Sequence, residues 1–355
     1  MKLFLYIQNE LIVDFCFAVG GMLVLSLPGA AVSAVNKLAG VDASVLLSFL
    51  PFLLANLLPY LLPLGFLLAL VVTYGRLAAD NEWTAIRMAG VHPIHMLLPA
   101  LPLSLALGAL SLWFCAEGQP LVRELQDKTA ISAVRRTITN LSPGRTELHL
   151  GNFSLIAGSR EGNDFKQAVI HVPAMNGHAA ETLAARRVRF GFAGEETMLV
   201  HLDHARIVHG SLDVTNENPT FQFNLRDLQK QSNKDYRTLR YRRSSDIAAE
   251  LETGKVEAKK ADVMRFEIHQ RNSIASIYFV YLFLGLPIGL ILGRGKQLGA
   301  LALAIGVALL YYVLAMRLGQ DLATHHILPP LLCAWTVNVL GLLTGLWLMR
   351  KAWRQ

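Results

Sequence analysis

The sequence contains only three cysteines, Cys16, Cys115 and Cys333, in 355 residues. Each lies within a long apolar stretch and none lies in the polar middle of the chain, which excludes a disulfide framework of the kind that holds small secreted domains together. In apolar surroundings a single cysteine behaves as a small hydrophobic residue. We therefore predict packing roles for all three.

Common catalytic and nucleotide-binding motifs are also missing. The chain has no Gly-x-x-x-x-Gly-Lys-[Ser/Thr] loop, no Gly-x-Ser-x-Gly elbow and no His-Glu-x-x-His pair. The net charge of +7 is not accompanied by any nucleic-acid-reading module, so we expect no nucleic-acid partner. The nearest approach to a metal site is His201, Asp203 and His204 with His209 nearby, but only two of these side chains would share a strand face, too few for zinc. We expect no metal, no cofactor and no catalytic residue.

Long apolar runs are what the sequence has in excess. It is 53% hydrophobic, whereas soluble chains are usually about 45–50% apolar. A run of about 20 apolar residues is long enough for a helix to cross a bilayer. The predicted spans, three on each side of a polar segment, are 11–35, 43–75, 96–116, 272–293, 297–316 and 327–349. The second is longer than one crossing needs, so we expect it to be tilted or broken.

Basic residues near the ends of the spans predict the orientation, because lysine and arginine favour the cytoplasmic side. With a cytoplasmic N-terminus, two basic residues, Lys37 and Arg317, fall in the short outer loops. Those on the inside are Lys2, Arg76, Arg87, Arg294, Lys296, Arg350, Lys351 and Arg354. We predict that both termini are cytoplasmic and that the polar middle lies outside the membrane.

The polar middle reads as a β domain entered and left through helices. Short alternating runs separated by Gly-Asn and Asn-Pro turns are typical of an all-β sandwich or roll. The expected strands are 146–150, 153–157, 168–172, 182–192, 197–202, 205–209 and 220–224. The predicted organisation is therefore 1–116 for the first three spans, 117–271 for the outer β domain with helical connectors, and 272–355 for the last three spans.

Between the second and third spans, about 78–91, we predict a short amphipathic cytoplasmic helix. Asp80 or Asn81 can cap it, Glu82 lies in its first turn, and Gly90 with Pro93 ends it. An interfacial helix lying on lipid is the alternative interpretation. Charge within the spans is almost absent, Asp14 being the main exception, so an exporter built this way must take its energy from a partner.

Three local patterns resemble one known family, the permease subunits of the lipopolysaccharide exporter, LptF and LptG. The first is Tyr-Gly-Arg-Leu at 74–77 followed by Asn-Glu-Trp-Thr-Ala-Ile-Arg-Met-Ala-Gly at 81–90. The second is Glu-Ile-His-Gln-Arg at 267–271, followed by Leu-Pro-Ile-Gly at 286–289. The third runs from Leu-Pro-Pro at 328–330 to Asn338. The order and spacing of the three patterns carry the resemblance, which covers the full length of the chain.

The resemblance implies a fold of six transmembrane helices plus an inserted all-β periplasmic domain, a β-jellyroll, in the bacterial inner membrane. It implies a transport subunit rather than an enzyme, with ATP hydrolysed by a separate cytoplasmic ATPase dimer. Such a subunit is one half of a pair, with a paralogous permease as the other half. It extracts lipopolysaccharide and passes it through the jellyroll to periplasmic bridge proteins. The lead-in at 267–271 leans towards LptF.

The resemblance also suggests site residues. Glu82 falls at the position of the family's acidic residue that meets the ATPase, and we predict that Arg76, Arg87 and Gly90 belong to the same coupling site. The family places basic residues at the outer end of the first span against lipid phosphate, and Lys37 is the nearest here. From the strand pattern, the candidates for an acyl-chain groove are Phe153, Leu155, Val169 and Phe221.

Three other interpretations remain open. The chain could be the permease of another lipid or lipoprotein ABC exporter, although those have four spans and a larger outer domain. It could be a lipid-modifying membrane enzyme that uses the His201 cluster, or a scaffold or receptor. Co-purification with an ATPase would favour transport over the last two.

Overall fold

The structure is a computed structural model. It describes residues 2–37, 43–139, 147–150, 153–161, 164–172, 181–194, 197–209, 212–216, 220–224, 239–254, 256–293, 295–325 and 327–354. These residues form two compact units. The first contains Met1–Ser26, Ala55–Leu121 and Asp235–Gln355, and the second contains Leu27–Leu54 and Val122–Lys234.

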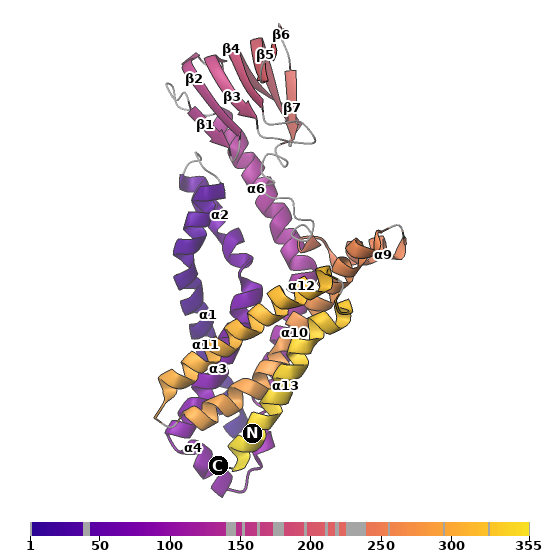
Figure 1. The fold of residues 1–355 in the computed structure, drawn as a ribbon. Coiled ribbons are helices and arrows are strands. Elements are labelled where there is room, and N and C mark those ends of the chain that lie inside the picture. Colours follow the sequence, from indigo (N-terminus) through magenta and orange to yellow (C-terminus); the bar gives the residue numbers. More distant parts are fainter. Residues whose placement is uncertain are drawn as a thin grey trace. The chain divides into compact units, whose positions relative to one another are not determined.

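Helices make up the first unit (Figure 1). Their bounds are α1 Lys2–Lys37, which continues into the second unit, α3 Leu58–Ala79, α4 Glu82–Met88, η1 Pro93–Met96, α5 Leu101–Trp113, η2 Phe114–Gly118, α9 Ser244–Glu252, α10 Ala258–Leu292, α11 Gln297–Tyr312, η3 Val313–Leu318, α12 Gly319–Thr324 and α13 Pro330–Arg354. Both α3 and α5 have a proline in the first turn, where the missing N–H costs nothing. Two segments, η2 and η3, are π-helical turns inside longer helices.

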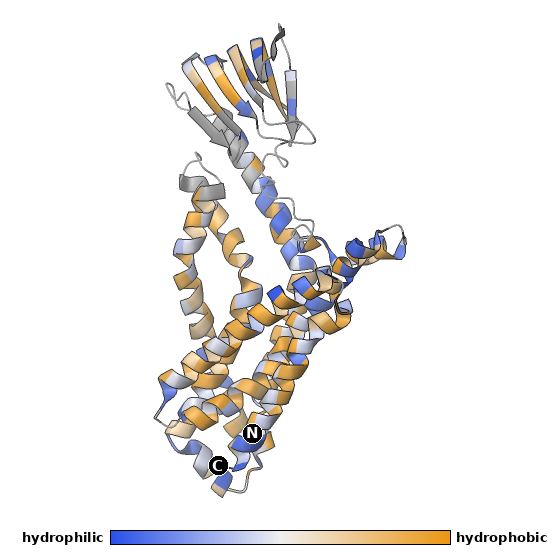
Figure 2. Ribbon diagram, in the orientation of Figure 1, coloured by the Kyte–Doolittle hydropathy of each residue, from blue (hydrophilic) through white to orange (hydrophobic). Residues whose placement is uncertain are grey.

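Six helical segments of the described residues are long and apolar enough to cross a membrane, which confirms the six predicted spans. They are Lys2–Val35, Leu58–Ala79, Leu101–Thr129, Ala258–Leu292, Gln297–Thr324 and Pro330–Arg354. Figure 2 shows their hydrophobic residues along the helices and the hydrophilic residues gathered on α9. The long second stretch is broken: α2, Ala43–Ala55, ends at a turn before α3 begins.

A close contact between α3 and α10 forms the centre of the first unit. Gly285, Gly289 and Gly293 follow one another at four-residue spacing on α10, a pattern that lets helix backbones approach. A Cβ atom on Gly289 would lie 2.9 Å from the carbonyl oxygen of Val71, and one on Gly293 would collide with the carbonyl of Gly75. The two helices therefore pack backbone to backbone, and most of their apolar side chains are buried.

The second unit contains α2, most of α6, Gln119–Thr139, and one seven-stranded antiparallel sheet. The strands are β1 Glu147–Leu150, β2 Phe153–Glu161, β3 Asp164–Val172, β4 Glu181–Ala193, β5 Thr197–His209, β6 Leu212–Asn216 and β7 Thr220–Asn224. Strands β1 to β6 are neighbours in chain order, and β7 pairs with the first half of β5. With the six spans, this sheet confirms the predicted fold class, a helical membrane protein with an inserted all-β domain.

One row of residues interrupts the sheet's alternation. Gln167 in β3 and His204 in β5 have a positive φ of 51°. The ladder skips both residues, together with Gly158 and Arg186, at the same level of neighbouring strands. The pairing register is the same on both sides of this row, so each strand has one unpaired residue and none has the extra residue that defines a β-bulge. In β3, β4 and β5 the buried side chains shift across the row from one set of alternate positions to the other, for example from Phe165 to Ala168 in β3. The sheet thus keeps one apolar face, with Leu155, Ile170 and Leu202 all buried on it.

Candidate functional site

The short helix between the second and third spans is α4. Its cap residue Asn81 has a φ of 61°, in the left-handed region that asparagine tolerates, and Glu82 lies in its first turn. Gly90, with a φ of 80°, ends the segment in a conformation that favours glycine. Residues 78 and 79 of the predicted helix belong instead to α3, because the chain turns at Asp80 and Asn81.

Trp83 fixes this helix against the helical core. Its indole is buried, 4% exposed, while Met88 at the other end is 85% exposed. The guanidinium of Arg87 lies 5.7 Å from the centre of the Trp83 ring, within the range of a cation–π interaction. Glu82 is half-buried beside it. The helix is therefore held on one side and presents Arg87 and Met88 on another.

A cluster of charged side chains joins the start of α1 to the segment before α4. Nη2 of Arg76 lies 2.6 Å from a carboxylate oxygen of Glu10 and 3.7 Å from one of Asp14. The hydroxyl of Thr73 donates to the same Asp14 carboxylate at 2.7 Å. The Tyr6 hydroxyl approaches Glu82 at 3.4 Å. Of the predicted coupling residues, the structure thus brings Arg76 against α1 and leaves Arg87 on the surface of α4.

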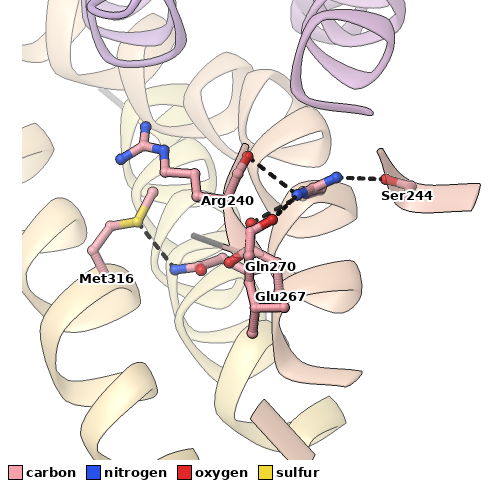
Figure 3. A network of polar contacts seen from close by, with 7 residues as sticks. Arg240, Ser244, Glu267, Gln270 and Met316 are labelled. Atoms are coloured by element: carbon pink, nitrogen blue, oxygen red, sulfur yellow. Dashed lines mark hydrogen bonds and ion pairs between the residues drawn. The ribbon is translucent and has the colours of Figure 1, made fainter. Parts of the chain in front are cut away.

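A second polar cluster surrounds Arg271 in the first half of α10 (Figure 3). Its guanidinium donates to Glu267 at 3.1 Å, to the Ser244 hydroxyl at 2.8 Å, and to the backbone carbonyls of Leu239 and Arg240 at 3.0 and 3.2 Å. The side chain is only 4% exposed. Buried cations are stable only when their donors are satisfied in this way. This arginine therefore fastens the segment that returns from the β domain onto α10.

The neighbouring residue Gln270 reaches a different helix. Its side-chain amide donates to the carbonyl of Ala315 at 3.4 Å and to the Met316 sulfur at 3.0 Å, both in the π-helical turn η3. A π turn displaces a backbone carbonyl from its usual partner, and such turns are frequent at functional sites. Thus Arg271 contacts residues 239–244, the segment that returns from the β domain, and the adjacent Gln270 contacts the fifth span.

The predicted groove residues do not share one face of the sheet. Leu155 is fully buried in the apolar core, with Ile170 as its partner in β3. Val169 lies on the opposite face and is 44% exposed, next to the exposed Ile156. Phe153 belongs to β2 and Phe221 pairs in register with Val200, but these two side chains lie outside the described residues. The same holds for the side chain of Lys37, the last residue of α1.

The histidines of β5 are placed separately. The His201 ring is 2.9 Å from the Thr220 hydroxyl of β7. His204, which is unpaired in the ladder of β5, is exposed. Within the described ranges, no three His, Cys, Asp or Glu side chains converge on a position that could hold a metal ion.

The sequence reasoning missed the partners of two arginines. Glu10 and Asp14 are four residues apart on α1 and therefore lie on one helix face, a spacing that suggests a shared cationic partner. Arg271 was noted only as part of a motif. Its four-residue spacing from Glu267 was a local signal, whereas its contacts with residues 239–244 depend on the fold.

Comparison with protein families gives a match that covers nearly the whole chain. The family model described as lipopolysaccharide export system permease LptF/LptG matches residues 5–351. Comparison with curated proteins gives no match.

Proposed function

The chain belongs to the LptF/LptG family of lipopolysaccharide export system permeases, and we propose that it is one membrane half of an ATP-driven lipopolysaccharide exporter. In this proposal it extracts the lipid from the inner membrane and passes it to the inserted β domain. The observation that supports it most is the family match over residues 5–351, which covers the β domain and all of the six candidate spans except residues 2–4 of the first and 352–354 of the last. The match does not separate LptF from LptG.

A separate ATPase dimer would supply the energy through α4. This helix is fixed by buried Trp83, keeps Met88 and Arg87 on its surface, and holds Glu82 in its first turn. A helix held on one side can transmit a displacement, whereas a loosely attached one cannot. Because Glu82 is a carboxylate next to an exposed surface, an arginine of the ATPase is a suitable partner.

Reconstitution tests this function directly. The chain, its partner permease and the ATPase would be purified from native membrane and placed in proteoliposomes containing lipopolysaccharide. Transfer of lipopolysaccharide to an added periplasmic acceptor should require ATP. Transfer of another lipid or of a lipoprotein, with lipopolysaccharide left behind, would support a different exporter instead.

The coupling residue has its own test. Glu82→Ala should weaken binding of the ATPase by about 1–3 kcal/mol, roughly 5- to 150-fold in Kd, because a charge-assisted contact is lost. Asp80→Ala, on the exposed turn just before α4, is the matched control and should bind normally. Unchanged ATPase binding and transport in Glu82→Ala would contradict the coupling role.

We propose further that the β domain is periplasmic and that both termini are cytoplasmic. In a cysteine-free background, a cysteine at exposed Ser159 of β2 should react with an impermeant thiol reagent in spheroplasts. A cysteine at Met88 of α4 should react only after lysis. The reversed pattern would overturn the orientation and the direction of transport.

The sheet is proposed as the conduit for acyl chains. Leu155 lies on the buried apolar face and Val169 on the exposed face, so photo-crosslinking residues at these two positions distinguish the faces. Lipopolysaccharide adducts at Leu155 that increase with ATP would place the acyl chains on the apolar face. If neither position nor Phe153 and Phe221 gives adducts during turnover, the domain is a docking module rather than a conduit.

A further inference from the structure

The cluster at the inner end of α1 has a geometry that joins three segments. Glu10 and Asp14 are one turn apart on α1, and the guanidinium of Arg76 lies 2.6 and 3.7 Å from their carboxylates. Arg76 is in the last turn of α3, immediately before the chain turns into α4. Thr73, which is fully buried in the helical core, fixes the Asp14 carboxylate by a hydrogen bond of 2.7 Å. The Asp14 carboxylate is thus positioned by the helical core as well as by Arg76, and the Glu10 carboxylate is positioned by its close contact with Arg76.

The rest of α1 is weakly packed. Only 6% of its apolar window is buried, against 67% for α3 and for α10. Its fully buried side chains in the first unit include Ile7 and Leu11, which flank Glu10. The attachment of α1 within the first unit thus includes this stretch, which also carries the ionic contacts, and a second contact where the Val19 side chain packs against Gly65 of α3.

Charge balance makes the attachment to Arg76 specific. Two carboxylates face one guanidinium, and none of the three side chains is more than half exposed. Near the end of a span, a carboxylate without a cation is poorly solvated, so each carboxylate favours the conformation in which Arg76 is close. Apolar contacts tolerate sliding, whereas an ion pair of this geometry is lost when the two helices separate.

We infer that Glu10, Asp14 and Arg76 form an ionic clamp that makes α1 move together with the coupling segment. The three are positioning residues: they hold α1 against the end of α3, and they act on transport through α4. The contact of Tyr6 with Glu82, at 3.4 Å, adds a second link between the same two segments. This inference rests on the proposed function, because it takes α4 as the element that receives the ATPase's displacement.

The experiment measures two quantities in the complete complex: the distance between α1 and α4, and the lipopolysaccharide transferred per ATP hydrolysed. Spin labels at Phe17 of α1 and Met88 of α4, both well exposed, would be introduced after the three native cysteines are replaced. The distance distribution between the labels would be recorded with and without a non-hydrolysable ATP analogue. Lipopolysaccharide transferred per ATP hydrolysed would be measured on the same variants.

With the native clamp, the distribution should be narrow and should keep its width when nucleotide binds. Arg76→Glu should broaden it and lower the transfer per ATP by about tenfold or more, while the ATPase still co-purifies. The exchanged pair Glu10→Arg with Arg76→Glu should restore both readouts, which a general loss of folding would not allow. Arg350→Gln, which removes an exposed arginine from the last turns of α13, is the control for charge alone.

A narrow distribution with normal transfer per ATP in Arg76→Glu would overturn the clamp. So would failure of the exchanged pair to restore either readout. Glu82→Ala separates this failure from that of the proposed function. If Glu82→Ala releases the ATPase while the Arg76 variants behave normally, the coupling helix stands and only the clamp is wrong. If Glu82→Ala leaves ATPase binding and transport unchanged, the proposed function itself loses its coupling site.

Discussion

Replacing Arg271 by methionine should release residues 239–244, the segment that returns from the β domain, from their contact with α10. Methionine keeps much of the length and apolar surface of the arginine stem but removes every donor. Four acceptors lose their partner: the Glu267 carboxylate, the Ser244 hydroxyl, and the backbone carbonyls of Leu239 and Arg240. Water cannot easily replace the guanidinium, because the arginine side chain is only 4% exposed.

The magnitude follows from what remains buried. Removing one member of a buried ion pair typically costs about 3–5 kcal/mol, because the other charge is left uncompensated. Glu267 is that charge here, with its side chain 15% exposed. Arg271→Met combined with Glu267→Met should therefore recover a large part of the loss, since neither charge is then buried. Arg271→Lys should lie between, because an ammonium group cannot reproduce the planar fork that reaches both the carboxylate and the carbonyls.

Hydrogen exchange in detergent or nanodiscs measures the effect locally. Amides of α9 should exchange faster in Arg271→Met, by a factor of about 100 or more for a loss of about 3 kcal/mol if the segment opens by itself. Amides of α4, Glu82–Met88, serve as the internal control. Unchanged exchange in α9, or a double variant as unstable as the single one, would refute the reasoning.

Three further predictions concern the packing of the helices, the core of the sheet and an ion pair of the sheet. Gly293→Ala should destabilise the helical unit by about 1–3 kcal/mol in thermal unfolding, because the added methyl group would collide with α3. Gly306→Ala should be neutral or stabilising by up to about 1 kcal/mol, because a Cβ atom at this position would have no neighbouring atom within 4 Å. Leu155→Ala should cost about 2–5 kcal/mol in the stability of the sheet, and Val169→Ala much less, as measured by hydrogen exchange. A hydrogen bond from Arg189 of β4 holds the pKa of Asp164 below its usual value. The stabilising effect of the ionised Asp164 is therefore complete above about pH 4 and is lost as the pH falls through the lowered pKa. Asp164→Asn should remove this acid dependence from hydrogen exchange in β3 and β4.

The layout of the fold was predictable because it depends on local signals. Apolar run length gave the six spans, and turn residues gave the β domain. The exceptions have physical reasons. The sequence pattern divided β5 at Asp203, because two polar residues in succession end a simple alternation. In the structure His204 has a positive φ and is unpaired in the ladder, and the strand continues beyond it in the same register. Strand β6, Leu212–Asn216, was missed although Leu212 and Val214 alternate with polar residues, because the run lies between turn signals, Gly-Ser at 210–211 and Asn-Glu-Asn-Pro at 216–219.

The candidate site was predictable only in part. The position of Glu82 followed from capping and turn signals along the chain, which need no knowledge of neighbours. The partner of Arg76 could not be derived, because hydropathy places helices across a membrane without fixing which faces meet. The same limit applies to Leu155 and Val169: their opposite faces became clear only from the register between β2 and β3. Predicting either contact requires tertiary information that composition and spacing do not contain.

The packing of the first unit suggests where its conformational change is located. The apolar windows of α3 and α10 are 67% buried, and the glycines between them leave no room for one backbone to slide past the other. The windows of the first, fifth and sixth spans are 6%, 22% and 22% buried. Closely packed interfaces switch between discrete arrangements instead of deforming gradually, so we expect the displacement proposed to reach α4 to have little effect within the α3–α10 pair. It is more easily taken up by α1, which is held by the ionic clamp, and by the fifth span, whose π-helical turn is contacted by Gln270. The two polar clusters thus connect the closely packed α3–α10 pair to α1 and to the fifth span.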